Sequence, residues 1–146
     1  MNTNEDGIRL LKHFEAGSGF ATKAYWDKLG KVWTLGWGFT KGVKEGDSMT
    51  EEEGNARLAE ELKGYEENLS GCCTIEPTSN QFSAMVCLSW NIGKIGFANS
   101  DVLKFHNLGE VDRAAKAFMN WTSSGGIKDV PGLVKRRKAE ATLYLK

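Results

Sequence analysis

Apolar residues at the start of the chain recur every three to four positions, which is the period of an α-helix. This helical pattern begins after Asn4 or Asp6, either of which is a suitable cap, and runs to about Glu15. Two glycines, Gly17 and Gly19, then end it. We therefore expect one short helix before the first change of pattern.

Residues 24 to about 43 change to a shorter period, with glycines between short segments rich in Trp, Tyr, Val and Thr. This pattern predicts a small antiparallel sheet. Asp27 followed by Gly30 is typical of a type I turn within it. Strict alternation from Val32 to Phe39 would place the large apolar side chains on one face and leave Thr34 on a nearly bare face.

The rest of the chain has helical spacing. Thr50 followed by Glu53 is a capping box that opens a long helix. One stripe of that helix is apolar: Leu58, Leu62, Tyr65 and Leu69. Beyond Pro77 the spacing predicts helices at about 79–92, 100–107, 110–121 and 133–145, with loops at 122–126 and 131–132.

These elements together predict an α+β fold in a single domain, residues 1–146. We expect a small N-terminal lobe with a short antiparallel sheet (about 12–50), a linking helix (about 51–69) and an all-helical C-terminal lobe (about 70–146). Such a layout commonly leaves a cleft between the lobes.

The composition, with 40% hydrophobic and 26% charged residues, is that of a globular protein. The formal net charge of zero gives no global attraction to nucleic acid or to an anionic membrane. We interpret the basic run 135–138, and the acidic residues of the predicted linking helix, as solvated helix faces.

Three cysteines, Cys72, Cys73 and Cys87, are an odd number, and two of them are adjacent. Adjacent cysteines bridge each other only with strain, so we expect reduced thiols in a protein made in the cytosol. No apolar run marks a signal peptide or a membrane span, so we expect synthesis in the cytoplasm without either.

Glu15 is the first candidate for chemistry. Ile8, Leu11 and Glu15 follow helical spacing, so the carboxyl falls within the apolar stripe. Lost hydration favours the protonated form of a carboxyl, which suits it to donating a proton near neutral pH. The alternative is a glutamate that curls back to solvent at the helix end.

Asp27 is the second candidate, although a turn alone explains an aspartate there. A hairpin can carry it back over the end of the first helix, near Glu15. Two carboxyls in different environments are what cleavage of a glycosidic bond requires. Thr34 would add one hydroxyl beside them.

Other chemistries find less support. The two histidines, His13 and His106, lie far apart and lack a partner at metal-ligand spacing, so we expect no metal and no cofactor. Neither a nucleophilic-serine motif nor a glycine-rich phosphate loop is present. Trp26 and Trp90 could offer stacking faces to sugar rings.

Three fragments near the start of the chain are Phe14-Glu15-Ala16-Gly17, Ala24-Tyr25-Trp26-Asp27 and Trp33 to Gly38. In this order they resemble the Glu, Asp and Thr signature of the phage lysozyme family of glycoside hydrolases. The match continues through residues 46–50, 81–84, 90–93, 97–103, 114–121 and 132–137, and so covers nearly the whole chain. Each fragment is weak alone, but the ordered set is specific.

The resemblance implies a lysozyme-like fold and hydrolysis of the β-1,4 bond between N-acetylmuramic acid and N-acetylglucosamine in bacterial peptidoglycan. It implies that Glu15 is the general acid and that Asp27 and Thr34 hold the attacking water, with net inversion. Trp90, Asn91 and Ser100 would line the sugar cleft. We expect a monomer whose partner is the glycan strand, with no nucleic acid and no membrane insertion.

Three features depart from the family pattern. Gly17-Ser18-Gly19 resembles an insertion between the two carboxyls, Lys31 is one residue extra, and Phe39 stands where many members have histidine. A shift of the carboxyls would lower the rate first, because catalysis tolerates little misplacement. A lytic transglycosylase and a non-catalytic wall-binding module remain the alternatives.

Overall fold

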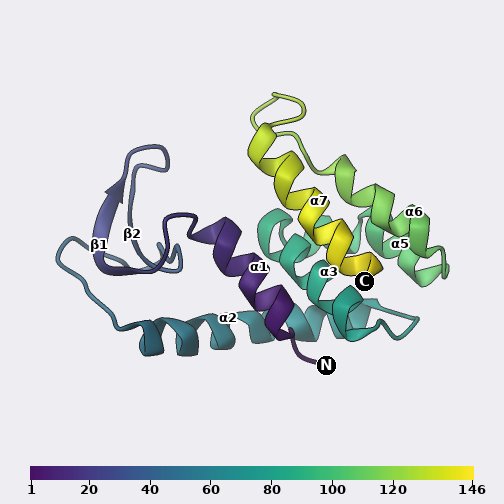
Figure 1. Ribbon diagram of the computed structural model, residues 1–146, viewed down its shortest axis with the longest axis horizontal. Helices are drawn as coiled ribbons and strands as arrows, with labels where there is room; N and C mark the ends of the chain where they lie inside the picture. Colours follow the sequence, from purple (N-terminus) through teal and green to yellow (C-terminus); the bar gives the residue numbers. More distant parts are fainter. The chain divides into compact units, whose positions relative to one another are not determined.

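The computed structural model describes all residues from 1 to 146. The chain folds into two compact units: residues 11–61 form one, and residues 1–10 with 62–146 form the other. Two helices are divided between the units, α1 (Glu5–Glu15) and α2 (Glu51–Cys72) (Figure 1). The predicted α+β class is confirmed.

The smaller unit, residues 11–61, contains a two-stranded antiparallel sheet made by β1 (Ala21–Asp27) and β2 (Val32–Gly36). Its core includes Leu35, Phe39 and Leu58, which are all buried. The predicted turn at residues 27–30 joins the strands, and the Asp27 carboxylate accepts a hydrogen bond from the Leu29 N–H at 3.1 Å.

Side-chain caps start both divided helices, as the sequence predicts. The Asn4 side chain accepts a hydrogen bond from the Gly7 N–H at 2.9 Å at the start of α1. Thr50 and Glu53 exchange two hydrogen bonds at the start of α2, the capping box expected there. The apolar stripe of α2 is buried at Leu58, Leu62 and Leu69, while Tyr65 is half-buried.

The larger unit is otherwise helical: α3 (Ser79–Ile92), α4 (Lys94–Ala98), α5 (Asp101–Asn107), α6 (Val111–Ala117), a 3₁₀ turn (Phe118–Asn120) and α7 (Pro131–Leu145). Helix α3 is buried without a break from Phe82 to Ser89. It packs against α7, and the two helices lie side by side in Figure 1.

Three details of this unit differ from the sequence prediction. Helix α7 begins at Pro131, so the loop expected at 131–132 is wrong; proline is favoured at the first helical position. Helix α4 was not expected, because its five residues are too few for a periodic pattern and include a glycine. The helix expected at 110–121 ends at Ala117 and tightens into the 3₁₀ turn, where the Trp121 N–H donates to the Phe118 carbonyl. Such tightening is common at helix C-termini.

The interpretation of the basic run 135–138 as a solvated face is wrong for two of its members. Arg136 and Arg137 are buried in α7, and both pair with the fully buried Glu140, at 3.1 and 3.0 Å. Burial of two guanidinium groups is tolerated because a carboxylate and carbonyl oxygens receive their N–H groups. The i+3 and i+4 spacing to Glu140 was the available signal.

The cysteines form no disulfide. Cys87 is fully buried in α3, as predicted for a small apolar side chain, and its thiol lies 3.3 Å from the Gly7 carbonyl. No helix combines the length and the apolar character that a membrane span requires.

Candidate active site

Glu15 is the last residue of α1. It is half-buried, which is intermediate between a carboxyl inside the apolar stripe and one that curls back to solvent. The loop after β2 approaches it closely: a Cβ at Gly38 would lie 2.8 Å from the Glu15 carbonyl oxygen. One turn earlier, the Lys12 ammonium lies 4.5 Å from the centroid of the Trp37 ring. The end of α1 that bears the carboxyl therefore lies against the segment following β2.

Asp27 ends β1 and is half-buried. One carboxylate oxygen serves the turn by accepting from Leu29, and the other would lie 3.0 Å from a Cβ at Gly30. The absence of a side chain at Gly30 keeps space beside that second oxygen. The turn thus fixes the carboxylate and leaves one of its oxygens for further hydrogen bonds.

The strand register places Asp27 and Thr34 on one face of the sheet. Asp27 is opposite Val32, and Tyr25 is opposite Thr34, so these four residues share a face. Trp26 is opposite Trp33 on the other face, where their ring centroids lie 5.6 Å apart. Diagonal neighbours such as Asp27 and Thr34 are typically about 7–8 Å apart between Cα atoms, a separation that one water molecule can bridge.

Thr34 is not on the bare, open face that the alternation suggested. It is only 5% exposed, and its hydroxyl lies 3.4 Å from the Val32 carbonyl. The expected strand also ends early: Gly36 and Gly38, with φ of 66° and 91°, turn the chain so that Leu35 and Phe39 exchange backbone hydrogen bonds. The two glycines allow this reversal, because glycine adopts positive φ at little cost.

Trp37 and Phe39 therefore hold the reversal rather than line one face of a longer strand. The Trp37 indole N–H donates to the Asn55 side chain at 2.9 Å, and its ring packs edge-on against Phe20. Phe39 is buried, and the Arg57 guanidinium lies 4.4 Å from its ring centroid. The residue in the family's histidine position thus contributes packing and a cation–π contact.

The three predicted sugar-lining residues belong to the larger unit. Trp90 and Asn91 lie in the last turn of α3, where Trp90 packs against Tyr65 with ring centroids 5.2 Å apart. Asn91 is exposed and accepts a hydrogen bond from Arg137. Ser100 is buried as the N-cap of α5, where its hydroxyl accepts from the Leu103 N–H and donates to the Phe97 carbonyl.

The sequence pattern did not predict the contact between Arg137 and Asn91, because the two residues lie in different helices and are 46 positions apart. An amide whose oxygen accepts from a buried guanidinium keeps its NH₂ group available as a donor. Asn91 is thereby held in one orientation.

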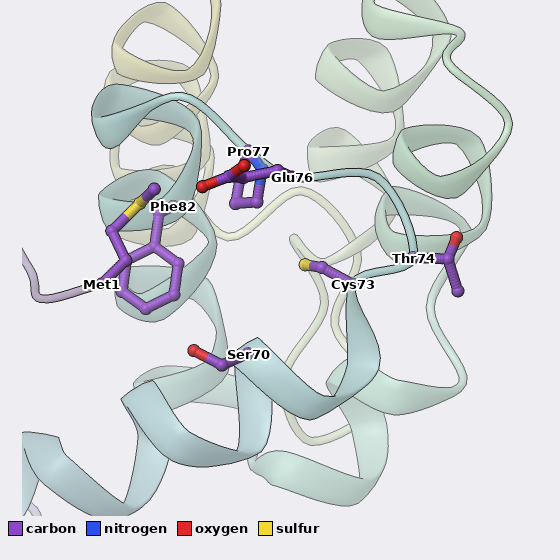
Figure 2. A pocket seen from close by; sticks show the side chains of 7 residues that line it. All are labelled: Met1, Ser70, Cys73, Thr74, Glu76, Pro77 and Phe82. Carbon is purple, nitrogen blue, oxygen red and sulfur yellow. The ribbon is translucent and has the colours of Figure 1, made fainter.

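A hollow of about 330 Å³ lies elsewhere in the larger unit, as Figure 2 shows. Its lining consists of Met1, Ser70, Cys73, Thr74, Glu76, Pro77 and Phe82. None of the six candidate residues borders it, so it is not part of the candidate site. No three side chains of the types that bind metals are grouped closely enough to hold an ion.

Comparison with known proteins decides the family. A model described as phage lysozyme matches residues 13–140. The endolysin of Acyrthosiphon pisum secondary endosymbiont phage 1 is 36% identical over 147 residues, which are 99% of this chain and 98% of that protein. The chain belongs to the phage lysozyme family. Membership makes this phage lysozyme family protein a glycoside hydrolase.

Solved structures agree with that membership. The endolysin from Escherichia coli O157:H7 phage FAHEc1 superposes on this phage lysozyme family member with a TM-score of 0.89 at 29% identity, covering 100% of this chain and 94% of that one. The muramidase domain of SpmX from Asticaccaulis excentricus gives a TM-score of 0.85 at 33% identity, covering 99% and 98%. The predicted lysozyme-like fold is confirmed.

Proposed function

We propose that this chain is an endolysin that cleaves the β-1,4 bond between N-acetylmuramic acid and N-acetylglucosamine with inversion at the anomeric carbon. The general activity, hydrolysis of peptidoglycan, follows from membership in the phage lysozyme family. The name of the related muramidase domain supports the choice of bond. The roles of individual residues are our inference from the site.

Glu15 would protonate the glycosidic oxygen, while Asp27 and Thr34 would hold the attacking water. The observation that carries this assignment is the register, which puts Asp27 and Thr34 on the same face of the hairpin. A carboxylate oxygen accepts a proton from water, and a hydroxyl both accepts and donates, so the pair can orient one water molecule. Glu15 lies at the helix end that the segment after β2 contacts through Gly38.

A water between the carboxyls is the reason to expect inversion. Inverting glycosidases separate their two carboxyls by about 6.5–9.5 Å to admit a water, whereas retaining enzymes hold them about 5–5.5 Å apart. In a double displacement Asp27 would attack the sugar directly, and Thr34 would have no water to orient. The expected first product is therefore the α anomer from a β-linked strand.

Trp90, Asn91 and Ser100 are proposed to form the glycan-binding surface of the larger unit. Asn91 has the free donor for an N-acetyl carbonyl, because Arg137 occupies its oxygen. Half-buried Trp90 offers one ring edge and face. Ser100 uses its hydroxyl within the helix cap, so we expect it to contribute by shaping the start of α5.

We also propose that the chain acts as a monomer, is synthesised in the host cytoplasm, and reaches the wall after release. Its unbridged cysteines support synthesis in a reducing compartment. Analytical ultracentrifugation at micromolar concentration is expected to give a single species with the mass of one chain. A species with the mass of two chains would contradict the proposal that the protein acts as a monomer.

Two measurements on purified peptidoglycan test the proposed reaction. Mass analysis of the released muropeptides is expected to show reducing ends, whereas 1,6-anhydro ends would instead indicate the lytic transglycosylase. Proton NMR of the first-formed anomer is expected to show the α form. A β product would overturn inversion, and no release at all would favour the wall-binding alternative.

Substitution of Thr34 separates its proposed role from its packing. Thr34→Val keeps the side-chain volume and removes the hydroxyl, so we expect kcat to fall by at least about tenfold while the melting temperature changes little. Thr34→Ser is the matched control, because it keeps the hydroxyl and removes only a methyl group. Equal kcat for the valine variant and the parent would remove Thr34 from the mechanism.

A further inference from the structure

The turn of the β1–β2 hairpin presents apolar side chains to solvent. Leu29 in the turn is 96% exposed, and Tyr25 and Trp26 in β1 are each 47% exposed. A leucine so exposed contributes almost nothing to packing in the folded chain. Three large exposed apolar side chains on one hairpin form a candidate contact surface.

The same hairpin carries a local positive charge on a chain of zero net charge. Residues 21–36 contain Lys23, Lys28 and Lys31, all exposed, and one acid, Asp27, so three positive charges and one negative give a net charge of +2. Lys28 and Lys31 flank the exposed leucine within the turn. An anionic surface would therefore attract this end of the hairpin.

The exposed aromatic residues lie on both faces of the sheet. Trp26 shares a face with Trp33, whereas Tyr25 shares the other face with Thr34. A platform for stacking on a sugar would gather its rings on one face. An apolar tip with lysines beside it and aromatic rings on both sides instead matches the layers of a lipid interface, where Trp and Tyr lie at the headgroups and lysines reach phosphates.

We propose that this hairpin turn docks onto membranes rich in anionic phospholipids, with Leu29 entering the headgroup boundary. Docking of this kind is peripheral and requires no spanning helix. Each lysine near an anionic surface strengthens binding on the order of fivefold, an effect that salt screens. The same turn holds the Asp27 carboxylate, but binding to vesicles is measured without peptidoglycan, so the inference does not depend on the proposed function.

The test is co-sedimentation of the full chain with vesicles. The parent is expected to bind vesicles of phosphatidylethanolamine with phosphatidylglycerol, to bind vesicles of phosphatidylcholine weakly, and to be released from the former by salt. The double variant Lys28→Gln/Leu29→Ser should bind the anionic vesicles about tenfold more weakly. Glu15→Gln should bind them as the parent does.

The matched control removes the same two side-chain types elsewhere. Ile95→Ser/Lys116→Gln changes an 81% exposed isoleucine and an exposed lysine in the larger unit, and it should bind vesicles as the parent does. Neither double variant should change the melting temperature appreciably, because all four side chains are exposed. Ile95→Ser/Lys116→Gln should also digest membrane-free peptidoglycan at the parent's rate.

Three results would overturn the proposal. The parent could bind both kinds of vesicle equally, or the hairpin variant could bind anionic vesicles as well as the parent. The hairpin variant could also lose binding to purified peptidoglycan while keeping its binding to vesicles. That last result would assign the surface to the glycan strand.

Discussion

Gly38 is the residue at which the segment after β2 touches the end of α1. Its φ of 91° disfavours any residue with a side chain, and an added Cβ would lie 2.8 Å from the Glu15 carbonyl oxygen. Movement of that carbonyl would displace the helix end that carries the proposed acid. The rate of catalysis should be sensitive to this residue although it offers no chemical group of its own.

We therefore expect Gly38→Ala to lower both stability and wall lysis. Left-handed backbone alone costs about 1–2 kcal/mol for a residue with a Cβ, and the clash adds to it. Gly42→Ala is the matched control, since Gly42 has a φ of 74° but nothing within 4 Å of an added Cβ. Urea unfolding and turbidity assays should show a larger loss of both for Gly38→Ala; equal losses would mean that the approach to Glu15 is unimportant.

Substitution of the proposed acid gives the most direct test at this scale. Glu15→Gln keeps the shape of the side chain and removes the proton that it would donate, and general acid catalysis of this kind contributes about 10²–10⁴-fold. We expect turbidity clearing of cells with permeabilised outer membranes to fall below a hundredth of the parent rate. Circular dichroism should show an unchanged fold. Clearing above a tenth of the parent rate would contradict the assignment.

Among the elements, α2 has a start that depends on pH. A hydrogen bond from the Thr50 backbone N–H holds the pKa of Glu53 below its usual value of 4.5, and the Thr50 side chain makes a smaller contribution in the same direction. A carboxylate with a lowered pKa stabilises the folded state above the unfolded pKa, and this contribution is lost as the pH falls through the lowered value. The capping box should therefore weaken in acid.

Thr50→Ala should destabilise the chain by about 1 kcal/mol near neutral pH, because it removes the side-chain cap. We expect this difference from the parent, measured by urea unfolding, to shrink as the pH falls below about 4. Glu53→Gln is the control, because it keeps a hydrogen-bonding side chain that does not titrate. A constant difference from pH 7 to about pH 3 would show that the Thr50 side chain does not interact with the Glu53 carboxylate, because both proteins keep the backbone hydrogen bond.

The elements were predictable where a local signal defines them. The start of α3 follows from Thr78 and Gln81, which form the capping box observed there, and Asp27 with Gly30 predicts the hairpin turn. The end of β2 was not predictable, since an alternating pattern continues through Gly36 and Gly38 while the backbone reverses. The alternation of apolar and polar residues alone does not distinguish a continuing strand from a chain that reverses direction at the end of the strand.

The candidate site divides in the same way. The sequence predicted a hairpin with Thr34 beside Asp27, and the observed register places both residues on one face. Thr34 is buried on a strand face that the alternation left bare, and the orientation of Asn91 depends on Arg137 in another helix. Contacts between residues distant in sequence are set by packing, which local patterns do not encode.

At the scale of the whole molecule, two weak acids make stability depend on alkaline pH. Burial raises the pKa of the Cys73 thiol to about 11, with a smaller contribution from the neighbouring Cys72. Burial, and then Cys73, raise the pKa of Tyr144 to about 12. A raised pKa on an acid means that the neutral form is favoured in the fold, so its stabilisation is present below the unfolded pKa and lost as the pH rises through the folded value.

We expect the melting temperature to fall between pH 9 and 12, from the ordinary value of the thiol to the raised value of the phenol. Cys73→Ser removes the first of these groups and should begin its fall at higher pH. If the melting temperatures of Cys73→Ser and the parent fall over the same pH range, this thiol does not titrate as expected.

The triple variant Cys72→Ser/Cys73→Ser/Cys87→Ala should keep most of its lytic activity at pH 7, since the thiols form no disulfide.

The buried trio of Arg136, Arg137 and Glu140 also restricts how this sequence can diverge. Replacing Glu140 alone would leave two guanidinium groups without the carboxylate they share, and breaking a buried ion pair costs about 3–5 kcal/mol. That cost is comparable with the whole stability of a marginal domain, so few descendants would survive a single replacement. Drift at these positions is therefore expected to proceed through compensated, near-simultaneous exchanges, and the three residues should be inherited together as one unit.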